Sequence, residues 1–324
     1  MSPRVDRLAP PFRLEATRDG LHVEETLLWL DARLGKELAF LSRVPPQPKK
    51  ITSKILASEE TIHLLRLFQH EVDSLSCQYQ RPFSIGALSL ELFPTGAAFG
   101  GAALLLRQKN SSLLYMPEMG FLSPERILEF PPVTQVIMGA FCPDPKTVQA
   151  HFDQEWDRLC VTLASLLQVG KSPFLVSPFL AFPQRILSAP VLQSVPVHMH
   201  PILIRMHRIY EKFTASPSLY QVPAPDSAIM ISPFLPPRKS LELSQRPLLT
   251  LIRDDHRTKW PECHPQNTFH FSFFCQKMYR QLFKQIMPEH IYFVGPYALR
   301  YAKAFKKCAP HVQPLFVEKQ PSLF

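Results

Sequence analysis

The sequence is short of glycine and contains no long apolar run. Only 10 of its 324 residues are glycine, against 34 prolines, where average usage gives about 7% and 5%. Loops that grip a ligand closely use glycine, because it adopts positive φ freely. No apolar run reaches the roughly 18 residues that span a bilayer, and the first residues, MSPRVDRLAPPF, lack the apolar segment of a secretory signal. We therefore expect a cytoplasmic protein without a membrane partner.

Several motifs of known chemistry are missing as well. The six cysteines are scattered without a CxxC pair, which argues against a zinc ribbon or a disulfide framework. The sequence has no G-x-S-x-G nucleophile elbow. It also has neither a G-x-x-x-x-G-K phosphate loop nor a G-x-G-x-x-G dinucleotide fingerprint. These absences exclude the common serine hydrolases and nucleotide-binding proteins.

The composition is that of a globular, basic protein. Hydrophobic residues make up 46% of the chain and charged residues 19%, which is enough apolar material for a core. The net charge of +9 favours anionic partners, nucleic acid first. A general contribution of the charge to solubility is the equal alternative.

The stretch from Gly20 to Pro48, GLHVEETLLWLDARLGKELAFLSRVPPQP, predicts two apolar strands joined as a hairpin. Asp31 closes the first run and Ser42 closes the second. A strand at 55–57 follows, and Ser58 predicts the N-cap of a helix that has two glutamates in its first turn.

Strands and helices then alternate along the chain, which predicts the α/β class. We expect strands at 84–93, 102–108, 111–117, 133–141, 173–179, 228–232, 246–253 and 290–295, and helices at 146–169, 182–187, 201–213, 276–286 and 297–307. We interpret residues 1–324 as one domain, with the proline-rich segment 190–245 as a bridging or inserted part.

The opening stretch resembles that of the metallo-β-lactamase superfamily, in its exonuclease and RNA-processing branch, which includes ligase-associated exonucleases. In that family a strand ends in Asp, and the next strand leads into a Ser-His-x-His-x-Asp-His loop that holds two zinc ions. The resemblance implies a four-layer αβ/βα sandwich. Here Ser42 is followed by Arg43-Val44-Pro45-Pro46-Gln47-Pro48, which contains no metal ligand.

The other ligand positions that the resemblance implies have also lost their donors. The family's first-loop ligands correspond here to Arg43, Pro45, Gln47 and Pro48. The Pro-Ala-Gly-His element corresponds to Pro94-Thr95-Gly96-Ala97, with Ala97 in place of the histidine. Three further positions correspond to Gly139, to Phe271-Ser272-Phe273 and to Val294-Gly295. Two acidic residues remain near the lost site. They are Asp31 and also Glu118, which lies in LLYMPE where the family has LLYTGD.

Two carboxylates are fewer than the three protein ligands of catalytic zinc. We therefore interpret the protein as a catalytically inactive relative of DNA- or RNA-processing nucleases, without a cofactor. It would bind nucleic acid or serve as a scaffold, with an active nuclease, a ligase or a helicase as its partner. The alternative is a metal-dependent hydrolase or exonuclease with a rearranged site built from Asp31, Glu118 and the histidines at 254–270.

Charged side chains near the lost site give two further expectations. Deletion of the metals leaves two carboxylates uncompensated, so we expect Arg43 to pair with one of them. Cations in this loop could instead contact phosphate, and the candidates are Arg43, Lys49, Lys50 and Lys54. A solvated loop is the simpler interpretation.

Three weaker patterns complete the candidates. His198 and His200 have His-x-His spacing, but we expect both in a polar turn. Asp254, Asp255, His256, Cys263, His264 and His270 are the densest group of possible ligands, in what we interpret as a surface loop. The last helix is basic through Arg300, Lys303, Lys306 and Lys307, which predicts an exposed helical face.

Overall fold

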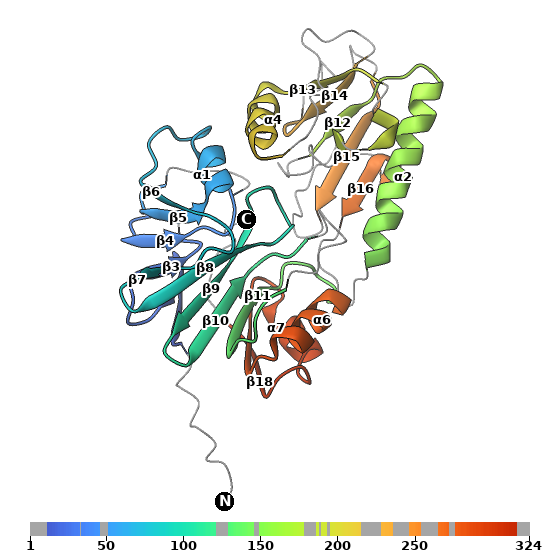
Figure 1. Ribbon diagram of the computed structural model, residues 1–324. Helices are drawn as coiled ribbons and strands as arrows, with labels where there is room; N and C mark the ends of the chain where they lie inside the picture. Colours follow the sequence, from blue (N-terminus) through green and yellow to red (C-terminus); the bar gives the residue numbers. More distant parts are fainter. Residues whose placement is uncertain are drawn as a thin grey trace, which may run out of the picture. The chain divides into compact units, whose positions relative to one another are not determined.

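The computed structural model describes residues 12–32, 34–45, 51–120, 129–145, 149–177, 186–187, 189–192, 195–214, 228–235, 246–253, 265–271 and 276–315. The chain forms two compact units (Figure 1). The first unit contains residues 1–146 and 274–324, and the second contains residues 147–273. Both units combine helices with β-sheets, so the protein belongs to the α/β class.

The first unit contains two sheets. The six-stranded sheet follows chain order, with β1 (Leu14–Thr17), β2 (Gly20–Val23), β3 (Leu28–Leu30), β4 (Leu38–Phe40), β5 (Ile55–Ser58) and β6 (Ser74–Cys77). The seven-stranded sheet has the order β18-β17-β11-β10-β9-β8-β7, with β7 (Phe83–Ile85), β8 (Leu88–Pro94), β9 (Ala102–Gln108), β10 (Ser111–Met116), β11 (Gln135–Gly139), β17 (His290–Val294) and β18 (His311–Pro314). Strands β10, β11, β17 and β18 run parallel to one another.

The two sheets of the first unit face each other across one hydrophobic core. Leu30 and Phe40 from the six-stranded sheet belong to the same buried cluster as Leu104, Leu113 and Tyr115 from the seven-stranded sheet. Each is 3% exposed or less, and burial of such a side chain stabilises the fold by about 1.5–3 kcal/mol. The alternating burial of β8 follows from this packing, since only one face of that strand meets the core.

Helices cover the other faces of both sheets. Helix α1 (Glu59–Leu65) begins at the N-cap Ser58, whose Oγ accepts from the backbone N–H of Thr61, and its Ile62 and Leu65 pack on the six-stranded sheet. Helices α6 (Gln276–Ile286) and α7 (Ala298–Ala304) pack on β17 through an aromatic cluster of Tyr279, Phe283, Phe293, Tyr301 and Phe305. The Phe293 ring lies 5.5–6.4 Å from the other four rings in edge or tilted contacts, which stabilise beyond the buried area alone.

The second unit contains a parallel sheet of five strands in the order β13-β14-β12-β15-β16. The strands are β12 (Phe174–Val176), β13 (Val197–Met199), β14 (Ile229–Ser232), β15 (Leu248–Arg253) and β16 (Thr268–Phe271), and the unit also contains α2 (Gln149–Gln168), α4 (Pro201–Phe213) and the 3-10 turns η1 (Pro190–Leu192) and η2 (Pro265–Asn267). Helix α2 packs along β16, where the Arg158 guanidinium lies 4.0 Å from the Phe269 ring centroid. Gly170, at φ +71°, ends α2.

Three features of the fold differ from the expectation. The apolar run from Leu21 to Leu30 divides into β2 and β3, because a turn with Glu25 at φ +61° lies between them. Strands β3 and β4 pair in parallel and form no hairpin. The chain also forms two compact units where one domain was expected, and the second unit begins well before the proline-rich segment 190–245.

Candidate functional site

The candidate site lies in the first unit, where several strands end. Glu118 follows β10, while Gly139 and Val294 are the last residues of β11 and β17. Since these strands are parallel and Gly139 pairs with Val294, their carboxyl ends lie at one edge of the sheet. This is the edge where parallel sheets commonly place functional side chains.

Asp31 lies just after β3 in a left-handed conformation, with φ +54°. Its backbone N–H donates to the Phe40 carbonyl over 2.7 Å. Its carboxylate accepts three hydrogen bonds: from the Ser42 N–H at 2.7 Å, from the Ser42 hydroxyl at 2.8 Å and from the Tyr115 hydroxyl at 2.7 Å. Burial raises the pKa of Asp31, and these bonds together with the charge of Arg43 oppose that rise.

Tyr115 brings a hydroxyl from the seven-stranded sheet to a carboxylate of the six-stranded sheet. Its side chain is 3% exposed, and burial together with the charge of Asp31 raises its pKa well above the ordinary value of 10.0. The hydroxyl therefore stays protonated and donates to Asp31. Our sequence analysis missed this residue, although a tyrosine inside the apolar run LLYM was a signal of a buried hydrogen bond.

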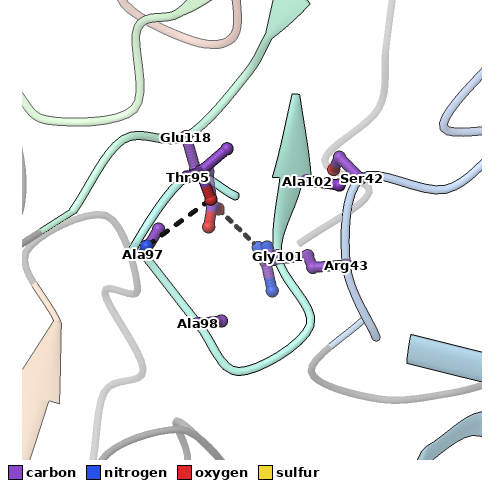
Figure 2. Close-up of a pocket in the computed structure, with 8 residues that line it drawn as sticks. All are labelled: Ser42, Arg43, Thr95, Ala97, Ala98, Gly101, Ala102 and Glu118. Atoms are coloured by element: carbon purple, nitrogen blue, oxygen red, sulfur yellow. Dashed lines mark hydrogen bonds and ion pairs between the residues drawn. The ribbon is translucent and has the colours of Figure 1, made fainter. Parts of the chain in front are cut away.

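Arg43 and Glu118 form an ion pair at the centre of the site. The Arg43 Nη2 lies 2.7 Å from the Glu118 Oε1, and their side chains are only 17% and 7% exposed. Figure 2 shows the two side chains with Thr95, Gly101 and Ala97 around them. The residues around the ion pair pack so closely that they leave no space for a water molecule between them. The expected pair of Arg43 with a carboxylate is present, and its partner is Glu118.

Ala97 lies in the loop between β8 and β9, which is held from both sides. The Gly100 carbonyl accepts from the hydroxyls of Ser58 and Thr61, each over 2.7 Å. On the other side the Gly120 N–H donates to the Thr95 carbonyl over 3.1 Å. A Cβ on Gly120 would overlap the backbone of Ala97, so this loop and the segment after Glu118 are in close contact.

The strand ends at Gly139 and Val294 carry no polar side chain into the site. A Cβ on Gly139 would collide with the Pro117 carbonyl, so the backbone leaves no room for a carboxylate there. The Phe141 ring lies against Gly139 and also against Gly295. Val294 packs at the edge of the hydrophobic core.

The remaining predicted site residues fall into two groups. Pro45 is buried at the end of the described loop. The Nζ of Lys54 lies 3.9 Å from the Oδ1 of Asp73. Gln47, Pro48, Lys49 and Lys50 lie outside the described residues, as do Ser272 and Phe273.

The weaker candidates lie in the second unit. The expected polar turn at His198 and His200 is wrong, because His198 is in β13 and His200 caps α4 by accepting from the Ile202 N–H. Residues 254–264 lie outside the described part of the chain, and His270 is exposed on β16.

The residues present do not fit the zinc pair that the family resemblance implies. Arg43 and Ala97 stand where the resemblance would place ligand histidines, and the Glu118 carboxylate is already paired with a cation. Within the described ranges, no three His, Cys, Asp or Glu side chains gather where they could hold a metal ion. We therefore derive no chemical step through a metal.

Among the helices that the structure describes, none is long and apolar enough to cross a membrane.

Comparison with known proteins gives structural likeness alone. No family model and no curated protein matches the sequence, whereas 93 chains of solved structures match the fold. One is the crystal structure of a protein of unknown function from Enterococcus faecalis V583, with a TM-score of 0.54 and 13% sequence identity over 87% of this chain and 79% of that chain. That coverage exceeds either unit alone, so the likeness includes parts of both. At this identity it concerns the fold only.

Proposed function

We propose that the protein is a non-catalytic member of the metallo-β-lactamase superfamily that binds nucleic acid as a subunit of a processing complex. The layer order of the first unit supports the family part of the proposal. Helix α1, two facing sheets and helices α6 and α7 follow one another, as in a four-layer αβ/βα sandwich. The position of Asp31 after β3, with Glu118 after β10, supports it further.

The ion pair between Arg43 and Glu118 is the observation that carries the loss of catalysis. Two zinc ions in such a site would be held by converging histidines and carboxylates and would activate a bridging water. In this protein a guanidinium supplies the positive charge beside Glu118. A fixed cation can neutralise the carboxylate, but it offers no open position for water or substrate.

The binding part of the proposal is supported by charge. The chain has a net charge of +9, and phosphate contacts provide most of the sequence-independent affinity for nucleic acid. An inactive subunit of this kind would act beside an active nuclease, a ligase or a helicase, which would supply the chemistry.

Metal content and nuclease activity of the purified protein test the proposal. We expect no stoichiometric transition metal, no change of melting temperature with chelator, and no cleavage of DNA or RNA when zinc or manganese is added, because a bound metal would stabilise the native state by linkage. Stoichiometric zinc together with a lower melting temperature in chelator would instead support the alternative, a hydrolase with a rearranged site.

A further inference from the structure

The segment that contains the outer helices of the first unit has a large excess of positive over negative charge. Residues 276–315 contain seven lysines and arginines and a single carboxylate, Glu289. This segment therefore has a net charge of +6, out of +9 for the whole chain. The concentration of charge in about one eighth of the sequence requires an explanation beyond general solubility.

Helical spacing places these cations opposite the buried faces of the helices. In α6, Tyr279, Phe283 and Ile286 are buried against the sheet, while Lys277 and Lys284 are exposed. Lys277, Arg280 and Lys284 follow the i, i+3, i+7 spacing of one helix face. The row spans about 10 Å along the axis at 1.5 Å per residue.

The end of α7 brings a second row beside the first. Arg280 donates to the Sγ of Cys308 over 3.7 Å, and its guanidinium lies 5.6 Å from the centroid of the Phe305 ring. Lys306 and Lys307 lie between these two contacts in the sequence and are both exposed. We name as the α6–α7 cationic face the six side chains of Lys277, Arg280, Lys284, Lys303, Lys306 and Lys307.

Several cations elsewhere in the first unit lie beside carboxylates, which is not the case for the described lysines of this face. Lys36 lies 2.9 Å from Asp19, and Arg107 lies 2.9 Å from Glu91. Within the described part of the chain, no lysine of the α6–α7 cationic face has a carboxylate within ion-pair distance. Uncompensated like charges repel one another, and an anionic ligand would relieve that repulsion.

We propose that the α6–α7 cationic face is the surface that binds the phosphate backbone of nucleic acid; this inference rests on the proposed function and names its binding surface. The site near β4 is a poorer choice, because Arg43 is already paired with Glu118. A lipid surface is disfavoured, because the large apolar side chains of α6 and α7 are mostly used against the sheet. Phosphate contact through lysines positions a backbone and carries no sequence preference.

The test compares two triple variants of the full chain. Lys303→Gln, Lys306→Gln and Lys307→Gln remove three charges from the face. Arg81→Gln, Lys109→Gln and Lys171→Gln remove three from exposed positions elsewhere. Fluorescence anisotropy measures the binding of a short labelled DNA duplex and of a single-stranded RNA across a salt series, and thermal melting checks the fold of each variant.

We expect the face variant to lose about tenfold or more in affinity at moderate salt. The slope of log K against log salt should become shallower by up to about 2.7 for the three lysines, since each lost phosphate contact removes roughly 0.9 for duplex DNA. The control variant should bind like the wild type. Equal losses in both variants, or no loss in either, would overturn the assignment of this face.

Further outcomes separate this inference from the function on which it rests. If the wild type binds neither nucleic acid at low salt, the proposed function fails. If it binds and the face variant binds equally well, only the surface assignment fails. Sedimentation with vesicles that contain phosphatidylserine gives the third outcome: binding to vesicles but not to nucleic acid would assign the face to a lipid surface.

Discussion

Positive charge is buried and paired at one place in the first unit and exposed at another. At the end of β4, Arg43 is largely buried and lies 2.7 Å from Glu118. On α6 and α7, the lysines of the α6–α7 cationic face are exposed and lack a carboxylate within ion-pair distance among the described residues. The same kind of group therefore stabilises the fold in one place and is available for a ligand in the other.

The environment of each cation accounts for this difference. A charge taken out of water loses several kcal/mol of hydration, so it must be paired where it is buried. An exposed charge keeps its hydration and gains little from a single partner. We therefore expect the loss of Arg43 to lower the stability of the fold and the loss of the lysines to lower the affinity for nucleic acid.

Replacement of Arg43 by alanine should give the largest effect. The free energy of unfolding should fall by about 3 kcal/mol, because the buried carboxylate of Glu118 loses the cation that neutralises it. Chemical denaturation measures this loss. Arg107→Ala is the matched control, since the pair of Arg107 with Glu91 is more exposed, at 40% for the arginine, and its loss should cost about 1 kcal/mol or less.

A double variant sharpens the interpretation of that loss. Addition of Glu118→Gln to Arg43→Ala removes the carboxylate charge that Arg43 neutralised and should restore part of the lost stability. Nucleic-acid binding of the double variant should match that of the wild type. Weaker nucleic-acid binding with unchanged stability would contradict this role of Arg43 and would show that Arg43 contacts phosphate.

Tyr115→Phe should give the next effect in size. The substitution keeps the ring in the core and removes the hydroxyl that donates to Asp31 over 2.7 Å. We expect the free energy of unfolding to fall by about 2 kcal/mol, as for a hydrogen bond to a charged group. Tyr292→Phe is the control, because Tyr292 lies in the same core cluster and its hydroxyl makes no hydrogen bond to the described residues. An equal loss in both variants would contradict the role given to the Tyr115 hydroxyl.

Asp31→Asn should have a smaller effect that depends on pH. Burial raises the pKa of Asp31 above its ordinary value of 3.8, so the folded state holds this proton more tightly than the unfolded chain. The contribution of Asp31 to stability is therefore greatest in acid and falls as the pH rises through the folded pKa. Asparagine does not titrate, and it tolerates the positive φ at this position.

The measurement is the difference in free energy of unfolding between Asp31→Asn and the wild type, taken by denaturation from about pH 4 to pH 7. The variant should gain stability relative to the wild type as the pH rises. A constant difference over this range would show that the pKa of Asp31 is not raised.

The smallest effect on stability should come from the α6–α7 cationic face. Neutralisation of Lys303, Lys306 and Lys307 should change the free energy of unfolding by less than about 0.5 kcal/mol, since these side chains are exposed. The affinity for nucleic acid should fall in the same variant. A large loss of stability would mean that these lysines are structural, like Arg43.

Local chemistry made some elements predictable from the sequence. Ser58 followed by Glu59 and Glu60 predicted the start of α1, and the structure has that cap. The strands expected at 102–108 and 111–117 are present as β9 and β10, which pair antiparallel. The missing ligands in the loop after Ser42 could also be recognised without a structure, because the identity of a side chain fixes which donor atoms it has.

Long-range pairing was beyond the sequence. The residues predicted that Arg43 would pair with Asp31 or Glu118, but the choice depends on which strand ends meet. Asp31 is satisfied by Ser42 and Tyr115, so the guanidinium pairs with Glu118. The parallel pairing of β3 with β4 and the division into two units were also decided by contacts between distant parts of the chain.

Signals that lie within a few residues of one another were enough to predict caps, turns, helix faces and the donor atoms that are present. Which of those groups meet depends on the fold, since the free energy of a pair depends on burial and partner geometry, which no local pattern contains. The cations show both sides of this division. Their number and helical spacing can be read from the sequence, whereas the fold determines which of them lie beside a carboxylate.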